Sequence, residues 1–264
     1  MKTQTFTIMH GGLGNQLFQY FFASTKTSQS RSNAMRLVTD FLGRYSSPRN
    51  IELLPLIESR LSDRLSLSNA DALLRMRIPK LLKRITGREF VVSIPGYGLI
   101  VDGYFQELRN YKNCPGDVLA AELALWRSTL TQRLSLSLPG KGQITHIRLG
   151  DFFNDREAAR SFAARQLSAI SGPTDLVTDQ EDVLADELAK LDLAHPVRLL
   201  PSADMSAWDL MALMCRYETI STNGSTLAFW AAVIRGAQLK STNQEHVAIW
   251  RLLLQAEGEG EHQR

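Results

Sequence analysis

Short apolar runs and segments of helical period alternate along most of the chain. The run from Phe6 to Met9 predicts a short buried strand, and it leads into a glycine-rich turn. Residues 15–25 then place leucine and phenylalanine side chains at helical spacing, which predicts a helix. A strand followed directly by a helix is typical of the first half of a βα unit, so the chain begins as an α/β protein would.

The rest of the first half gives a mixed pattern. We predict a strand at 35–38, a leucine-rich helical region at 51–88, one or two strands within 91–101 around the Pro95–Gly96 turn, and a helix at 117–135.

The second half alternates more regularly. Strands are predicted at 144–147, 175–178, 197–200 and 219–221, and helices at 155–170, 183–191, 207–215, 225–234 and 247–254. Asp179 is expected to cap the helix at 183–191, and the polar tail at 257–264 to fray. This order favours a parallel sheet covered on both faces.

Residues 137–142 form the best linker candidate, because they are short and rich in serine, proline and glycine. We therefore divide the 264 residues into an N-terminal domain, 1–138, and a C-terminal domain, 139–264. Each half is long enough for a small core of its own.

Composition narrows the classes of function. The sequence is 44% hydrophobic and 22% charged, with a net charge of +3, which does not favour a nucleic-acid-binding protein. Two distant cysteines argue against a disulfide framework and a zinc site. No signal-peptide core or membrane-spanning run is apparent, so we expect a cytoplasmic protein. The basic stretch 73–88, with six Lys or Arg and no acid, allows peripheral contact with the inner face of an anionic membrane; a solvated helix face is the simpler alternative.

The first motif is the turn His10-Gly11-Gly12-Leu13-Gly14-Asn15-Gln16-Leu17-Phe18-Gln19-Tyr20. Its glycines allow backbone N–H groups to approach an anion at the start of a helix, and Asn15 adds a side-chain donor. The dinucleotide-binding fingerprint is incomplete, since position 17 is leucine. A tight turn without a ligand is an equally good interpretation.

The second motif is Thr145-His146-Ile147-Arg148-Leu149-Gly150-Asp151-Phe152. His146 and Arg148 share one face of a strand, and the arginine fork suits a pyrophosphate. An Arg148–Asp151 ion pair that closes a turn is the structural alternative.

Two further motifs follow predicted strands. Ser221-Thr222-Asn223-Gly224-Ser225-Thr226 precedes a helix, where Ser225 or Thr226 can act as N-cap or help to bind an anion. Val101-Asp102-Gly103-Tyr104-Phe105-Gln106-Glu107 could line an acceptor site, although an exposed turn is the better interpretation of this motif taken alone.

Together, the four motifs resemble in order those of the alpha-1,2-fucosyltransferases: a GGLGNQ-(Leu/Met)-FQYA opening, a DGYFQ-like stretch, a central HxRxGDY and a late Asn-Ser-Thr-Phe-Ser-Trp-Trp segment. The matches here are residues 11–20, 102–106, 146–152 and 223–230. The chain departs from the pattern at Leu149, where the family often has a second arginine, and in the late segment at residues 224 and 227–229.

The resemblance implies a GT-B fold, in which two Rossmann-like domains with parallel sheets face each other across a cleft. The C-terminal domain would bind GDP-fucose and the N-terminal domain a galactose-terminated glycan. The implied reaction transfers L-fucose to the 2-hydroxyl of galactose with inversion, and a lipid-linked acceptor is one option. The C-terminal helix of such a chain can cross back onto the first domain.

The site residues follow from the same resemblance. Gly12, Gly14, Asn15, His146, Arg148, Ser225 and Thr226 would bind the donor. Arg148 would also stabilise the leaving diphosphate, and Asp151 is the first choice for general base, with Glu107, Asp102 and His10 as alternatives. Since the sequence has no Asp-x-Asp, we expect neither a metal site nor a cofactor.

Two other hypotheses remain open at this stage. One is a transferase with another GDP-sugar donor or linkage, such as alpha-1,6-fucosyl transfer, because that group shares HxRxGD. The other is a nucleotide- or sugar-binding protein without catalytic activity, which the altered late motif would suit.

Overall fold

The computed structural model describes residues 4–29, 34–39, 50–53, 65–68, 89–94, 98–134, 142–150, 153, 155–202 and 204–261. The chain divides into two compact units. Unit 1 comprises Met1–Leu130 and Leu252–Arg264, and unit 2 comprises Thr131–Arg251. The domain boundary expected between residues 138 and 139 lies outside the described residues.

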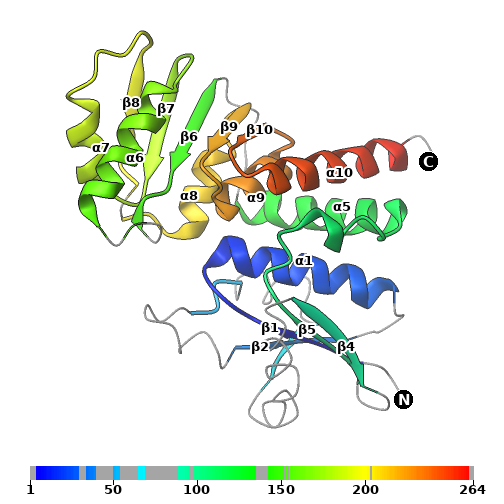
Figure 1. Cartoon of the computed structure of the whole chain (residues 1–264). Helices are drawn as coiled ribbons and strands as arrows, with labels where there is room; N and C mark the ends of the chain where they lie inside the picture. The colour runs from blue at the N-terminus through cyan, green and yellow to red at the C-terminus, as the bar shows by residue number, and fades with distance from the viewer. Residues whose placement is uncertain are drawn as a thin grey trace. The chain divides into compact units, whose positions relative to one another are not determined.

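Unit 1 is built on a five-stranded sheet in the order β3-β2-β1-β5-β4 (Figure 1). Its strands are β1 (Gln4–Ile8), β2 (Ala34–Val38), β3 (Leu65–Ser68), β4 (Phe90–Ile94) and β5 (Gly98–Asp102). β1 pairs in parallel with both β2 and β5, while β4 runs antiparallel to β5. The sheet is therefore parallel at its centre with one antiparallel edge strand, as is common in α/β units.

β3 corrects one prediction. Residues 65–68 lie in the region expected to be helical, yet they pair in parallel with β2. Their sequence, Leu-Ser-Leu-Ser, alternates with the period of a strand rather than of a helix. Residues 51–53 are also described, without a helix; the rest of that region, including the basic stretch 73–88, lies outside the described residues.

Unit 1 carries the helices α1 (Leu13–Gln29) and α5 (Gly116–Arg133), with a short 3-10 helix at Leu108–Asn110. Trp126 of α5 packs against two aromatic rings of α1, with ring centroids 4.9 Å from Tyr20 and 5.4 Å from Phe21. Such aromatic contacts bury a large apolar area and join the two helices.

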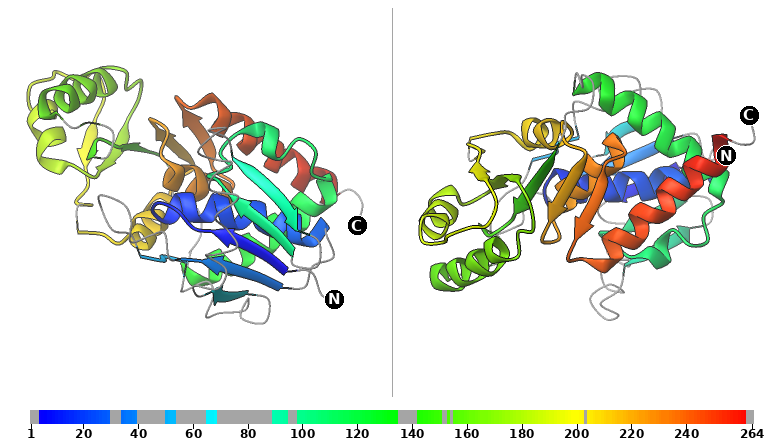
Figure 2. Two further views of the ribbon diagram at one scale, coloured as in Figure 1. Left: turned by 60° about the horizontal axis from the view of Figure 1, so that its bottom comes forward. Right: turned by 90° about the horizontal axis from the view of Figure 1, so that it is seen from above.

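Unit 2 has a second five-stranded sheet, in the order β10-β9-β6-β7-β8, and every described pairing in it is parallel. Figure 2 shows its strands from two further directions. The strands are β6 (Gln143–Ile147), β7 (Thr174–Thr178), β8 (Val197–Leu199), β9 (Thr219–Thr222) and β10 (Gln238–Ser241). β10 was not predicted, because Leu239 is its one buried apolar residue and its exposed neighbours conceal the pattern.

The helices of unit 2 follow its strands in turn: α6 (Arg156–Ser168), α7 (Glu181–Leu188), α8 (Ala207–Met214), α9 (Thr226–Arg235) and α10 (Gln244–Glu261). α6 and α7 pack with β6 and β7 around a cluster that includes Leu149, Ala163 and Leu176. α9 is buried along nearly its whole length, as its uniformly apolar sequence requires. The βα steps from β6 to α9 match predicted ones, and the α/β class with two Rossmann-like sheets is confirmed.

The C-terminal end differs from the prediction. Residues 257–261, expected to fray, continue α10, and α10 passes from unit 2 into the part of the chain assigned to unit 1. Leu253 and Ala256 are buried, and Glu257 forms an ion pair with Arg127 of α5. These contacts explain why a polar tail stays helical.

No helix in the described ranges is long and apolar enough to cross a membrane.

Candidate functional site

In unit 2, polar residues gather where β6, β7 and β9 end. β6 pairs with both β7 and β9, so the loops that leave the carboxyl ends of these three strands are neighbours. Arg148 follows β6, Asp179 follows β7 and Asn223 follows β9. Open α/β sheets bind their ligands at this edge.

Asn223 holds the backbone of Arg148 from both sides. The N–H of Arg148 donates to Asn223 Oδ1 at 2.9 Å, and Asn223 Nδ2 donates to the carbonyl oxygen of Arg148 at 2.8 Å. The second and third sequence motifs thereby meet, although 75 residues separate them. The side chain of Arg148, which is 27% exposed, projects from a fixed point of the chain.

Asp179 holds the same loop from the other side. Its carboxylate accepts from the N–H of Leu149 at 2.7 Å and of Gly150 at 3.1 Å, and lies 3.9 Å from Arg148 Nε. A Cβ on residue 150 would lie 3.0 Å from Asp179 Oδ2, which explains the glycine. The predicted capping role of Asp179 is therefore wrong: α7 begins at Glu181 after Gln180, and Asp179 bonds the loop after β6.

Leu149, where the resembling family often has arginine, is fully buried in the apolar core of unit 2. The position therefore serves packing in this chain. Asp151, the base expected from sequence, and the alternative Arg148–Asp151 ion pair lie outside the described residues.

His146 is almost fully buried in β6, and burial is the main reason why its pKa is lowered to about 4. The nearby Arg148 lowers the pKa further, whereas Asp179 acts in the opposite direction. At neutral pH the imidazole is therefore uncharged, and it can bind a ligand only as a neutral donor or acceptor.

Ser225 is the N-cap of α9. Its hydroxyl oxygen accepts from the N–H of Ala228 at 3.4 Å, and its own N–H donates to Thr222 Oγ1 at 3.0 Å. Both Ser225 and Thr226 are buried. The capping interpretation thus holds for Ser225, and the positive end of the α9 dipole lies directly after the loop that contains Asn223.

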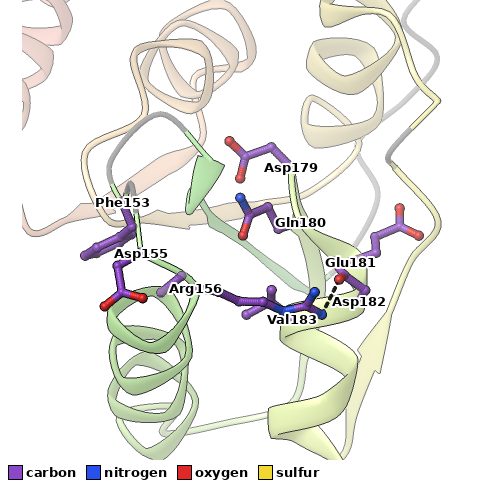
Figure 3. A pocket seen from close by; sticks show the side chains of 9 residues that line it. Phe153, Asp155, Arg156, Asp179, Gln180, Glu181, Asp182 and Val183 are labelled. Atoms are coloured by element: carbon purple, nitrogen blue, oxygen red, sulfur yellow. Dashed lines mark hydrogen bonds and ion pairs between the residues drawn. The ribbon is translucent and has the colours of Figure 1, made fainter.

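A cavity of about 550 Å³ opens beside this edge, where α6 and α7 begin (Figure 3). Four carboxylates line it, and each already accepts from the chain: Asp155 from the N–H of Glu157, Asp179 from the loop after β6, Glu181 from the N–H of Ser202 and Asp182 from Arg156. This acidic lining would repel a diphosphate, so the cavity suits neutral hydrogen-bond donors such as hydroxyl groups.

Unit 1 has a separate polar cluster where β1 and β5 end. His10 Nε2 lies 2.8 Å from Asp102 Oδ1, and the amide of Gln19 bonds both backbone groups of His10, accepting at 2.8 Å and donating at 3.2 Å. Gln106 donates to Asn15 Oδ1 at 2.9 Å. The first and fourth motifs are therefore brought together.

The glycine turn is closely supported by the chain itself. The first N–H of α1, that of Leu13, donates to the carboxylate of Glu52 at 3.2 Å. Gln16 is fully buried and bonds the backbone of Gly11, Asn50 and Glu52. A negative side chain thus occupies the helix N-terminus where an anion was expected to bind.

Asp102 is followed by a strained turn. Gly103 has φ 155°, and Phe105 has φ 54°, which is unusual for a side chain of this size. The carboxylate of Glu89 accepts from the consecutive N–H groups of Tyr104 and Phe105 and holds the turn in place. Glu107, an alternative base, has a half-exposed side chain and is paired with Arg109.

The residues predicted to bind the donor thus divide between the two units. Gly12, Gly14 and Asn15 lie in unit 1, with Gly14 buried inside α1, whereas His146, Arg148, Ser225 and Thr226 lie in unit 2. Sequence reasoning missed the roles of Asp179 and Asn223; their position directly after a strand was the available signal. Within the described ranges, no group of three His, Cys, Asp or Glu side chains could hold a metal ion.

No family model and no curated protein matches the chain. Among solved structures, it is similar to the fucosyltransferase NodZ from Bradyrhizobium, with 15% identity, TM-score 0.45, and 88% of this chain and 91% of that one covered. It is also similar to a glycosyl transferase family 9 protein from Veillonella parvula, with 10% identity, TM-score 0.41 and coverages of 91% and 81%. A third similar structure is the E. coli ADP-heptose lps heptosyltransferase II, with 13% identity, TM-score 0.37 and coverages of 99% and 100%. Because these identities and TM-scores are low, the function is inferred from the chain's own residues.

Proposed function

We propose that the protein is a glycosyltransferase that moves L-fucose from GDP-fucose to the 2-hydroxyl of a terminal galactoside, with inversion at the sugar carbon. The ordered motifs supply the family resemblance. The observation that carries the proposal is the double hydrogen bond by which Asn223 fixes Arg148 at the carboxyl edge of the unit 2 sheet.

Arg148 would stabilise the departing diphosphate. Its backbone is fixed by Asn223, and Asp179 lies near its guanidinium and bonds the two following N–H groups. A donor that is held in place before the reaction needs little reorganisation as charge develops, and one such donor typically contributes about 3–4 kcal/mol in the transition state. The N-terminus of α9 would add a partial positive charge.

The test is GDP release from GDP-fucose, with lactose and N-acetyllactosamine as acceptors, in the wild type and the Arg148→Ala variant. Arg216→Ala is the matched control, because it removes an exposed arginine from the same unit. We expect acceptor-dependent release that falls about 10²–10³-fold in Arg148→Ala and is unchanged in Arg216→Ala. Full activity in Arg148→Ala would show that the donor site is elsewhere.

We further propose that transfer needs no divalent metal, since an arginine and backbone N–H groups can stabilise the diphosphate. EDTA should leave GDP release unchanged. Loss of activity in EDTA that added magnesium or manganese restores would contradict this proposal.

The proposed acceptor is a glycan that ends in galactose. Lactose and N-acetyllactosamine test for a terminal galactoside, and linkage analysis of the product tests whether fucose is attached to the 2-hydroxyl.

The proposed location includes peripheral contact with a membrane through the basic stretch 73–88. Such contact would appear as binding to anionic vesicles at low salt, and an absence of binding under these conditions would contradict the proposal.

A further inference from the structure

One face of the unit 2 sheet carries polar side chains where a parallel sheet normally carries apolar ones. On the other face, the buried residues of β6, β9 and β10 lie in register: Ile144, Ile220 and Leu239. The polar face presents Thr145, Ser221 and Lys240, also in register. Parallel sheets are usually covered on both faces, and their strands are then apolar throughout. A polar row that includes the central strand β6 is therefore a departure, and such departures are expected at functional sites.

A cavity of about 260 Å³ lies against this polar row. Gln143 and Thr145 of β6, Ser221 of β9 and Lys240 of β10 line it, together with Gln166 from the end of α6. It shares no lining residue with the acidic cavity beside the beginnings of α6 and α7. Its volume is slightly below the range of about 300–1,000 Å³ that is typical of pockets for drug-sized ligands, so it suits a compact ligand.

The charge of the lining favours an anion. Lys240 Nζ reaches across β9 and donates to Gln143 Oε1 on β6 at 3.2 Å, so the ammonium group is held over the polar row. Among the described residues that line the cavity, none is Asp or Glu. A lysine ammonium group that no carboxylate neutralises is a good partner for a phosphate group.

The remaining polar groups of the lining suit a ligand with several acceptors and hydroxyl groups. Since Gln143 Oε1 accepts from Lys240, the amide N–H groups of Gln143 can donate to a ligand. The hydroxyl groups of Ser221 and Thr242, which both line the cavity, have no hydrogen-bond partner in the described part of the chain. A hydroxyl group both donates and accepts, so these two side chains can pair with hydroxyl groups of a polyol.

We propose that this cavity binds a small phosphorylated polyol of the size of a hexose phosphate. The three acceptor oxygens of a phosphate monoester would accept from Lys240, from the amide of Gln143 and from the hydroxyl of Ser221, and Thr242 would pair with a hydroxyl of the ligand. This site is independent of the proposed function, because it lies on a face of the sheet, whereas Arg148 follows β6 at the carboxyl edge.

The test is isothermal calorimetry of the whole protein with glucose 6-phosphate, inorganic phosphate and glucose. The wild type should bind glucose 6-phosphate more tightly than the other two, because only the ester combines the charge with the hydroxyl groups. Lys240→Met removes the ammonium group and should raise the Kd of glucose 6-phosphate about 10–100-fold. Lys190→Met is the matched control, since Lys190 is an exposed lysine of the same unit that does not line the cavity.

Ser221→Ala separates binding from folding. Its hydroxyl bonds to no described residue, so the variant should keep the wild-type thermal stability while the Kd of glucose 6-phosphate rises about fivefold. GDP affinity should be unchanged in both Ser221→Ala and Lys240→Met.

Four results would overturn the proposal. The first is a wild-type protein that shows no saturable binding of glucose 6-phosphate. Equal affinity in Lys240→Met and the wild type would place the ligand elsewhere. Inorganic phosphate that binds as tightly as the ester would leave an anion site with no role for the polyol. A loss of GDP affinity in Lys240→Met would make the cavity part of the donor site.

Discussion

At the residue scale, both polar clusters are organised by side-chain amides and carboxylates that bond to backbone groups. Asn223 and Asp179 hold the loop after β6, while Gln19 and Gln16 hold the turn after β1. Gln16 and Gln19 are fully buried, and a buried polar side chain is costly unless its groups are bonded, so these two residues fix one conformation of their turn.

The bonds of Asn223 to Arg148 should matter more for binding than for stability. Asn223→Asp keeps an acceptor for the Arg148 N–H but places a negative oxygen against its C=O, and Asn223→Ala removes both bonds. Each net hydrogen bond contributes about 1 kcal/mol, so the loss of both corresponds to about 2 kcal/mol, and we expect GDP affinity to fall by up to about 30-fold in Asn223→Ala. Isothermal calorimetry with GDP measures this, and an unchanged affinity would show that the Arg148 loop needs no such support.

Two buried histidines should make the protein sensitive to acid. Burial lowers the pKa of His146 and of His246 to about 4, against an ordinary value of 6.5. The unfolded chain binds more protons between these values, so stability is complete above 6.5 and is lost as the pH falls toward 4, by about 3 kcal/mol for each histidine.

His246→Leu removes one of these groups without touching the proposed site. We expect its free energy of unfolding to fall less than that of the wild type over the same pH range. Urea unfolding at several pH values measures the difference, and identical pH dependence in the two proteins would show that His246 does not contribute.

At the element scale, helix N-termini at the carboxyl edge of the unit 2 sheet are capped by side chains from the preceding loops. Ser206 caps α8, Ser225 caps α9 and Asp155 caps α6. Ser225 is buried and follows Asn223 closely, whereas Ser206 is exposed. Ser206 and Ser225 therefore cap their helices in different surroundings. Substituting each of them can separate an effect on GDP binding from an effect on the free energy of unfolding.

Ser225→Ala and Ser206→Ala form a matched pair. Each should lower the free energy of unfolding by about 1 kcal/mol through the lost cap. Only Ser225→Ala should also weaken GDP binding, because α9 begins beside Arg148. Equal GDP affinity in both variants would remove the N-terminus of α9 from the donor site.

At the scale of the whole molecule, α10 links the chain's last residues to unit 1. Its first part belongs to unit 2 and its last part, from Leu252, to unit 1. Leu253 is 1% exposed, and the ion pair of Glu257 with Arg127 of α5 adds a second contact. The C-terminal residues should therefore contribute to the stability of unit 1, whose first strand, β1, begins at Gln4.

Leu253→Ala tests this link, with Gln255→Ala as its exposed neighbour on the same helix. Deleting a buried leucine side chain costs about 2–5 kcal/mol, and amide exchange in α1 and α5 should become faster. Gln255→Ala should change neither quantity. Unchanged exchange in Leu253→Ala would show that unit 1 is stable without the end of α10.

The order of strands and helices could be predicted from sequence because it depends on local periodicity. Runs such as Ile144 to Ile147 and the helical spacing after Gly14 carry that signal within a few residues. Where the local signal was weak the prediction failed, as for β3 inside a leucine-rich region and for β10 with its single buried residue.

The sequence by itself determined the α/β class, the βα order of unit 2 from β6 to α9 and the placement of each motif after a strand. Tertiary structure alone decided the partners: Asp179 for the loop 30 residues before it, Asn223 for Arg148 across 75 residues, and Asp102 for His10 across 92. Periodicity reports the burial of a residue relative to its neighbours in sequence. Hydrogen-bond partners depend instead on which strands lie side by side, and that order is set by packing of the whole sheet.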